Sequence, residues 1–224
     1  YVIEHKNVSF AVAGGIIFIF LLLALSNYSM RSREHKQALL LAELSAILKT
    51  PLENELTQDE ILKGVKFYST PEQRADFAIA KLNELIKKFG KTPIGLSAKY
   101  QLAGLYLERG EPDTAIATYQ DALEQLKKRK SDQLLEHSAY LGIAKAYFLK
   151  EDYQRASEFY QKIINAQPAP EPYLAEALLG AIRTNIKLGN LDQAKELIIQ
   201  LNSKYPDSIY YQLAELELTK RINQ

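Results

Sequence analysis

The sequence contains no cysteine and only three histidines among its 224 residues. The absence of cysteine excludes a disulfide framework, a lipid-modified N-terminal cysteine and a zinc site built from thiolates. His5, His35 and His137 lie far apart in the chain and none belongs to an HExxH motif, so we expect exposed helix residues rather than metal ligands. The sequence therefore predicts no metal, no cofactor and no enzymatic activity.

A large net charge is also absent, since 28 Lys and Arg residues face 27 Asp and Glu residues. Without a net field, the chain is not drawn to nucleic acid or to an acidic membrane surface. The basic run Lys127–Lys130 falls at a predicted helix end, where cations complement the helix dipole. Phe89–Thr92 resembles the end of a phosphate-binding loop, but Leu85 stands where that motif needs glycine. We predict no nucleic-acid or nucleotide partner.

One uncharged apolar run stands out, from Val8 to Tyr28. It matches the roughly 20 helical residues that cross a bilayer core. Its aliphatic residues and phenylalanines together favour insertion by about 4 to 7 kcal/mol. A cleaved signal sequence is the alternative, because Ala24-Leu25-Ser26 offers small residues, but the chain retains the segment. We predict a single transmembrane helix within residues 1–30, in contact with the lipid bilayer.

The rest of the chain carries the helix-capping and helix-ending residues that are typical of an all-α protein. Thr57–Glu60 and Thr70–Gln73 each read as a helix cap, and Thr92 precedes a proline in the same way. Residues 31–69 are predicted to form membrane-proximal helices. The first of these helices carries an apolar stripe of Leu39, Leu40, Leu41, Leu44, Ile47 and Leu48.

An internal repeat follows within residues 70–224. Aligning Ala115, Ala156 and Ala194 also aligns other small or apolar residues at fixed distances. The aligned sets are Tyr119, Tyr160 and Ile198, then Ala122, Ile163 and Leu201, then Leu102, Ile143 and Ala181. This is the tetratricopeptide pattern, in which small residues let two helices pack closely and an aromatic ring fills the gap.

The pattern predicts three helix pairs, at about 96–129, 137–170 and 175–208. Residues 209–222 are expected to form a closing helix. Ala78, Leu82 and Leu85 are expected on the second helix of a degenerate earlier unit. The predicted fold is thus a transmembrane helix followed by a tetratricopeptide-repeat α-solenoid.

The segment Ala78–Ala98, followed by Leu102–Tyr106 and Gly110, resembles bacterial envelope tetratricopeptide proteins. With the N-terminal span, the whole chain resembles the YfgM-like family, ancillary subunits of the Sec translocon. That resemblance implies a bacterial inner-membrane protein with periplasmic repeats. It also implies translocon subunits and a PpiD-like chaperone as partners.

The charges beside the span favour the opposite orientation. Arg31, Arg33 and Lys36 follow it closely, whereas Lys6 precedes it. By the positive-inside rule, this count places the repeats in the cytoplasm. Of the two orientations, we expect the periplasmic one, which the resemblance implies.

The expected partner-binding surface is the concave face, which the first helix of each unit lines in this fold. The predicted groove residues are Ser97, Tyr100, Gly104, Leu107, Ser138, Leu141, Lys145, Phe148, Glu176, Leu179, Arg183 and Ile186. Tyr100 and Gly104 stand where chaperone-docking relatives carry a Lys and Asn carboxylate clamp, so that clamp is absent. A mixed, substantially apolar face suits a partner helix or an extended apolar segment. Packing of these residues against each other or against the closing helix is the alternative.

The predicted function is that of a membrane-anchored scaffold for protein–protein interaction, as an ancillary subunit of a translocon or chaperone assembly. The alternative is a structural or assembly subunit of another membrane complex, respiratory or envelope-spanning. In that case the span and the helix from Arg31 to Leu48 would hold the chain in place.

Overall fold

The computed structural model describes residues 32, 35–127 and 133–223, and the chain divides into two units, Tyr1–Phe67 and Tyr68–Gln224. The predicted transmembrane run, Val8–Tyr28, lies outside the described residues. Within the described part of the chain, no helix is both long enough and apolar enough to span a bilayer.

The first unit contains short helical elements. They are a helix over residues 35–49, the 3-10 helix η1 (Glu53–Glu55) and the helix α2 (Gln58–Leu62). The capping box predicted for α2 is confirmed. The Thr57 N–H donates to Glu60 Oε2 at 2.9 Å, and the Glu60 N–H donates to Thr57 Oγ1 at 3.4 Å. Both bonds satisfy backbone donors that lack intrahelical partners.

The apolar stripe predicted for the first helix is only partly buried. Leu40 and Leu44 are buried, whereas Leu39, Leu41 and Leu48 are exposed. Residues four apart share one side of a helix, so Leu40 and Leu44 lie together while their sequence neighbours point elsewhere. The consecutive leucines therefore do not form one buried face.

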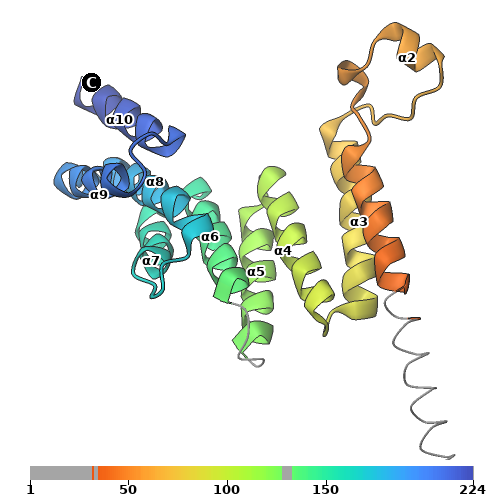
Figure 1. The fold of residues 1–224 in the computed structure, drawn as a ribbon, viewed down its shortest axis with the longest axis horizontal. Coiled ribbons are helices and arrows are strands. Elements are labelled where there is room, and N and C mark those ends of the chain that lie inside the picture. The colour runs from red at the N-terminus through yellow and green to blue at the C-terminus, as the bar shows by residue number, and fades with distance from the viewer. Residues whose placement is uncertain (1–31, 33–34, 128–132, 224) are drawn as a thin grey trace, which may run out of the picture. The chain divides into compact units, whose positions relative to one another are not determined.

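The second unit is a row of antiparallel helices (Figure 1). Each helix packs against the next one along the chain, and contacts also join α4 to α6 and α6 to α8. The last helix, α10, packs against both α8 and α9. We call α4, α6, α8 and α10 the inner row and α5, α7 and α9 the outer row. The bounds are α3 Pro71–Phe89, α4 Pro93–Glu108, α5 Pro112–Lys127, α6 Gln133–Leu149, α7 Tyr153–Ile164, α8 Glu171–Leu188, α9 Leu191–Lys204 and α10 Ile209–Ile222.

Threonine caps begin α3 and α4, as predicted. Thr70 Oγ1 accepts the Gln73 N–H at 3.1 Å, and Thr92 Oγ1 accepts the Gly95 N–H at 3.3 Å. A proline follows each threonine at the start of the helix. Its missing N–H removes no hydrogen bond there, because the first helical donors have no intrahelical acceptor.

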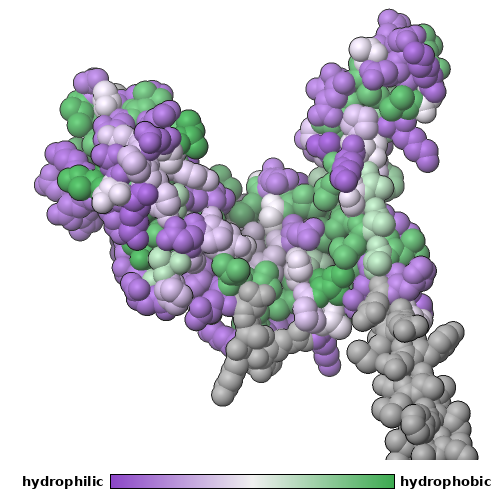
Figure 2. All heavy atoms as spheres, in the orientation of Figure 1, coloured by the Kyte–Doolittle hydropathy of each residue, from purple (hydrophilic) through white to green (hydrophobic). Residues whose placement is uncertain are grey.

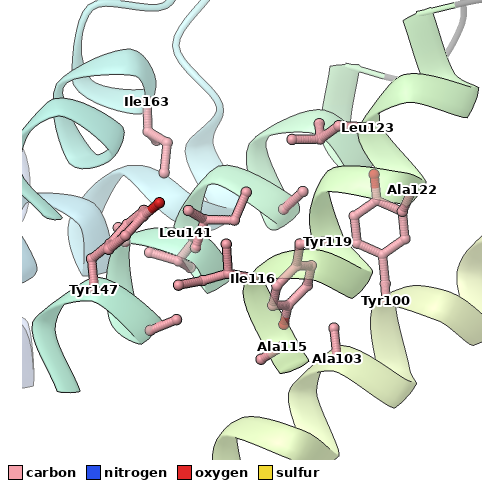
Figure 3. Packing of buried hydrophobic residues seen from close by; sticks show 14 of the residues in the cluster. Tyr100, Ala103, Ala115, Ile116, Tyr119, Ala122, Leu123, Leu141, Tyr147 and Ile163 are labelled. Atoms are coloured by element: carbon pink, nitrogen blue, oxygen red, sulfur yellow. The ribbon is translucent and has the colours of Figure 1, made fainter. Parts of the chain in front are cut away.

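The aligned small residues lie where helices touch. Ala115, Ala156 and Ala194 are fully buried, and the Tyr119 and Tyr160 side chains are 6% and 4% exposed. Figure 3 shows the Tyr119 ring beside Ala115, inside the cluster of buried apolar residues. A larger residue in place of these alanines would push the two helices of a pair apart.

Two clusters of buried residues occupy the interior between α4 and α10. The cluster formed by α4 to α8 is rich in alanine and tyrosine. The cluster formed by α8, α9 and α10 is mainly leucine and isoleucine. The composition of the interior thus changes along the row.

An aromatic ring covers a glycine at two junctions between successive helix pairs. A Cβ atom added to Gly142 of α6 would lie 2.2 Å from Cζ of Tyr119 of α5. At the next junction, a Cβ atom added to Gly180 of α8 would lie 2.3 Å from Cζ of Tyr160 of α7. Only glycine lets the inner helix approach the ring this closely.

The turns within the three helix pairs share one backbone form. Gly110, Glu151 and Gly189 have φ angles of 73°, 59° and 80°, in the left-handed region. In each turn the next residue donates its N–H to the carbonyl five residues earlier, over 2.8 to 2.9 Å. This is the hydrogen bond of a Schellman motif, which ends a helix and reverses the chain.

One histidine prediction is wrong. His137 is 9% exposed rather than exposed, and its ring lies 6.2 Å, edge-on, from Tyr140. It is buried because α6 packs against α4, α5, α7 and α8 and so has little surface left for solvent. Its Nδ1 has no hydrogen-bond partner among the described residues. His35 is exposed, and His5 lies outside the described residues.

Candidate protein-binding groove

A groove of about 480 Å³ opens along the inner row of the second unit. Every inner helix contributes to it, and one outer helix, α7, adds a single side chain. The residues that line it are Leu107, Glu108, Lys145, Phe148, Leu149, Tyr160, Glu176, Leu179, Gly180, Arg183, Tyr210 and Leu213.

The walls of the groove are mostly apolar. Leu107 comes from the end of α4, Phe148 and Leu149 from the end of α6, and Leu179 from the middle of α8. Phe148 is fixed by the Tyr153 ring, whose centroid lies 5.3 Å away in an edge-on arrangement. Leu149 remains 57% exposed, so its side chain is free for a further contact.

The helix α10 closes one side of the groove with Tyr210 and Leu213. An ion pair connects α10 to α8, because Arg183 Nε and Nη2 lie 2.7 and 2.6 Å from Glu217 Oε1. The loop before α10 is joined to α8 as well, since the Tyr205 hydroxyl donates to Glu171 Oε2 at 2.6 Å. α10 therefore takes the place that an inner helix of a further repeat would occupy.

The cations that line the groove are already paired with carboxylates. Lys145 Nζ lies 2.5 Å from Glu176 Oε1, which joins α6 to α8. Arg183 is held by Glu217, as described above. These pairs neutralise their own charges, so the groove offers little to an acidic ligand and more to an apolar one.

Six of the twelve predicted groove residues line this groove. They are Leu107, Lys145, Phe148, Glu176, Leu179 and Arg183. Partner binding by these residues stays a prediction.

The other six lie elsewhere. Tyr100 and Leu141 belong to the buried cluster of α4 to α8, and Ile186 belongs to that of α8 to α10. The Tyr100 and Leu141 side chains pack between helices, as the alternative expectation allowed. Ile186 is also buried, and it borders a separate pocket with Lys187 and Glu217. The half-buried residues Ser97, Gly104 and Ser138 also do not line the groove.

The sequence pattern missed the other half of the lining. Tyr160 was assigned to the gap between helices, yet its ring passes over Gly180 and reaches the inner face. Tyr210 and Leu213 were assigned to a closing helix without a role in the groove. Their spacing of three residues was the available signal, because it places both side chains on one face of α10.

Comparison with known proteins agrees with this architecture. Sequence profiles of the tetratricopeptide repeat match residues 96–169 and 176–208. The second unit is a tetratricopeptide-repeat solenoid. Such repeats present extended surfaces for binding other proteins, and neither profile describes a catalytic family.

Solved structures show the same fold at low sequence identity. One contains the nearly identical TPR-like repeats of a putative kinesin light chain from Podosopora anserina, at 16% identity and a TM-score of 0.54. That match covers 67% of this chain and 78% of the other. Another is a tetratricopeptide repeat protein from Parabacteroides merdae, at 18% identity and a TM-score of 0.53. It covers 74% of this chain and 57% of the other.

Two further observations add no information about function. The chain matches none of the curated proteins with which it was compared. Within the described residues, no group of three or more His, Cys, Asp or Glu side chains is placed to hold a metal ion.

Proposed function

We propose that the chain is a docking scaffold that binds another protein in the groove of its repeat unit. The observation that carries this proposal is the groove itself, an apolar surface whose cations are paired within the protein. An apolar side chain contributes about 1.5 to 3 kcal/mol when it is fully buried, whereas an exposed ion pair contributes about 0 to 1 kcal/mol. Binding in this groove therefore depends on apolar contacts.

We further propose that the scaffold is anchored by the apolar run Val8–Tyr28 in a bacterial inner membrane, with its repeats in the periplasm. Support for the anchor comes from the length of the run and its lack of charge. The sequence resemblance to the YfgM-like family supports a place beside the Sec translocon and a PpiD-like chaperone. The second candidate is a structural subunit of a respiratory or envelope-spanning complex, held by the span and the helix over residues 35–49.

A matched pair of variants tests the role of the groove. Leu149→Ser changes a residue that lines the groove and is 57% exposed, and Ile199→Ser changes a residue of α9 that is 68% exposed. Ile199 does not line the groove, so it serves as a control on a different surface. Figure 2 shows mostly polar side chains around α9. Neither change removes a buried side chain, and both variants are expected to fold.

The two full-length variants are purified in mild detergent, and the translocon, chaperone and respiratory subunits that accompany them are quantified. The docking proposal expects Leu149→Ser to lose its partner and Ile199→Ser to keep it. Retention of the partner by both variants would place binding outside the groove. Respiratory subunits in place of translocon subunits would favour the second candidate.

A single cysteine tests the membrane orientation, because the chain has no cysteine of its own. Gln120 lies on α5 and is exposed, so Gln120→Cys introduces an accessible thiol. A membrane-impermeant maleimide is expected to label this variant in spheroplasts without lysis. Labelling only after lysis would place the repeats in the cytoplasm and would contradict the translocon proposal.

A further inference from the structure

The Tyr160 side chain occupies an unusual place in the groove. It comes from the outer helix α7, and its ring lies across the backbone of Gly180 on the inner helix α8. A Cβ atom at Gly180 would lie 2.7 Å from the Tyr160 hydroxyl oxygen. The missing side chain of Gly180 thus opens a path by which a core tyrosine, 4% exposed, lines the groove.

The hydroxyl of Tyr160 forms no hydrogen bond with any described residue, and its side chain lines a largely apolar groove. Burial raises the pKa of this hydroxyl above its usual value, and Glu176 raises it further against an opposing effect of Arg183. The group is therefore protonated at neutral pH and has a proton to donate. The hydroxyl is not among the fully buried unpartnered atoms of the described residues, so water can reach it from the groove. A ligand that displaces this water must supply an acceptor in its place.

The charges around the hydroxyl restrict what that acceptor can be. Lys145 and Arg183 are both engaged by carboxylates, and Glu108 adds a further negative charge to the lining. A ligand carboxylate would meet Glu108 and Glu176 without a free cation to balance it. A neutral acceptor, such as a peptide carbonyl, avoids this repulsion.

The form of the ligand backbone follows from the same requirement. Inside an α-helix, each carbonyl already accepts a hydrogen bond from the N–H four residues later. In an extended segment, every carbonyl remains available to an outside donor. A tyrosine that needs one acceptor in an apolar groove therefore suits an extended chain better than the middle of a helix.

We propose that Tyr160 is the specificity-determining hydrogen-bond donor of the groove, and that its ligand is an extended, uncharged, apolar polypeptide segment. One backbone carbonyl of the segment accepts the Tyr160 hydroxyl proton, and its apolar side chains contact Leu107, Phe148 and Leu179. This inference rests on the proposed docking function and names the chemistry of the partner.

A pair of tyrosine-to-phenylalanine variants tests the role of the hydroxyl. Tyr160→Phe removes only the oxygen and keeps the ring on Gly180. Tyr119→Phe is the matched control, because Tyr119 covers Gly142 in the same way one repeat earlier but does not line the groove. Circular dichroism and thermal unfolding of both full-length variants establish that the fold is kept.

The probe is a fluorescent, end-blocked decapeptide of leucine, phenylalanine, alanine and serine. It is titrated with the full chain in lipid nanodiscs, and empty nanodiscs provide the background. We expect Tyr160→Phe to weaken binding by about three- to tenfold, the usual worth of one hydrogen bond, and Tyr119→Phe to leave it within about twofold. The same peptide with a central aspartate is expected to bind more weakly than the neutral one.

Peptides with single amide-to-ester replacements provide a second measurement, which does not depend on the stability of the variants. An ester carbonyl is a weaker hydrogen-bond acceptor than an amide carbonyl. We therefore expect an ester at one peptide position to reduce binding to the native chain and to have less effect on binding to Tyr160→Phe. Equal binding by native and Tyr160→Phe chains, without such coupling, would overturn the role of the hydroxyl. If the peptide does not bind and Leu149→Ser still loses its protein partner, the docking function stands and the extended ligand is wrong. If Leu149→Ser has no effect either, the docking function itself fails.

Discussion

The first two junctions between repeat units differ from the third. At the first two, Tyr119 covers Gly142 and Tyr160 covers Gly180. At the third, the positions in the same repeat register are Ile198 in α9 and Ala214 in α10, which follows the groove residue Leu213 as Gly180 follows Leu179; both belong to the aliphatic cluster. A ring over a glycine fixes the spacing of two helices sterically and carries a hydroxyl through to the inner face. An aliphatic pair buries apolar area but brings no polar group with it.

The largest expected effect comes from adding a methyl group under either ring. Gly142→Ala and Gly180→Ala would place Cβ atoms 2.2 and 2.3 Å from Cζ of Tyr119 and Tyr160, so a helix or a ring must move. We expect each change to cost about 3 kcal/mol of unfolding free energy, measured by denaturant titration.

Gly104→Ala is the control for these two variants. It lies within α4, and its added Cβ would be 3.8 Å from the Tyr119 hydroxyl oxygen, an ordinary contact. Relief of the entropy cost of a helical glycine should stabilise this variant by about 0.5 to 1 kcal/mol. Equal effects at Gly104 and Gly142 would mean that the ring–glycine contact does not set the helix spacing.

The second prediction moves the ring–glycine pair to the third junction. Ile198→Tyr alone should cost about 1 to 3 kcal/mol, because Ala214 carries a Cβ atom at the position where a ring covers a glycine in the other two junctions. Adding Ala214→Gly should cost less in that background than in the native chain, with a coupling energy of about 0.5 to 3 kcal/mol. Unfolding of the two single variants and the double variant measures this coupling. Strict additivity would show that the two positions do not face each other.

The packing within each helix pair could be predicted from the sequence. The repeat aligns an alanine with an aromatic or aliphatic residue four positions later, and each has a physical reason. Ala156 must be small where helices touch, and Tyr160 must be large where they part. The structure buries both, and the tetratricopeptide fold is confirmed.

The groove was harder to predict, because it depends on contacts between elements distant in the sequence. Whether Leu141 faces the surface or the interior is decided by neighbours on other helices, and this residue is buried. Tyr160 belongs to an outer helix, so a rule based on inner-helix positions passes over it. Gly180 is what lets this ring reach the groove, and a glycine within a helix does not by itself reveal what lies above it.

Alkaline pH should weaken the first two junctions, because each contains a buried tyrosine. Burial raises the pKa of Tyr119 to about 12 from its usual 10. The folded state holds this proton more tightly, so the stabilisation is complete below pH 10 and falls as the pH rises toward 12. The slope for one such group is about 1.4 kcal/mol per pH unit. Between pH 9 and 11, Tyr119→Phe should therefore lose about 1 kcal/mol less unfolding free energy than the native chain. An identical loss in both chains would contradict the assignment to Tyr119.

The smallest expected effect concerns the turns within the three helix pairs, where the turn between α6 and α7 differs from the other two. Gly110 and Gly189 hold the left-handed position in the first and third turns, whereas Glu151 holds it in the second, with φ of 59°. A residue with a Cβ atom is strained there by about 1 to 2 kcal/mol, and glycine is not, although glycine loses more entropy on folding. We expect Glu151→Gly to stabilise the chain by about 0.5 to 1 kcal/mol and Gly189→Ala to destabilise it by about 1 kcal/mol, both measured by thermal unfolding. Stabilisation by Glu151→Gly together with destabilisation by Gly189→Ala would show that the three turns share one geometry and differ only in the residue at the left-handed position. Destabilisation by both changes would show that the Glu151 side chain makes a contact that stabilises the turn by more than the strain costs.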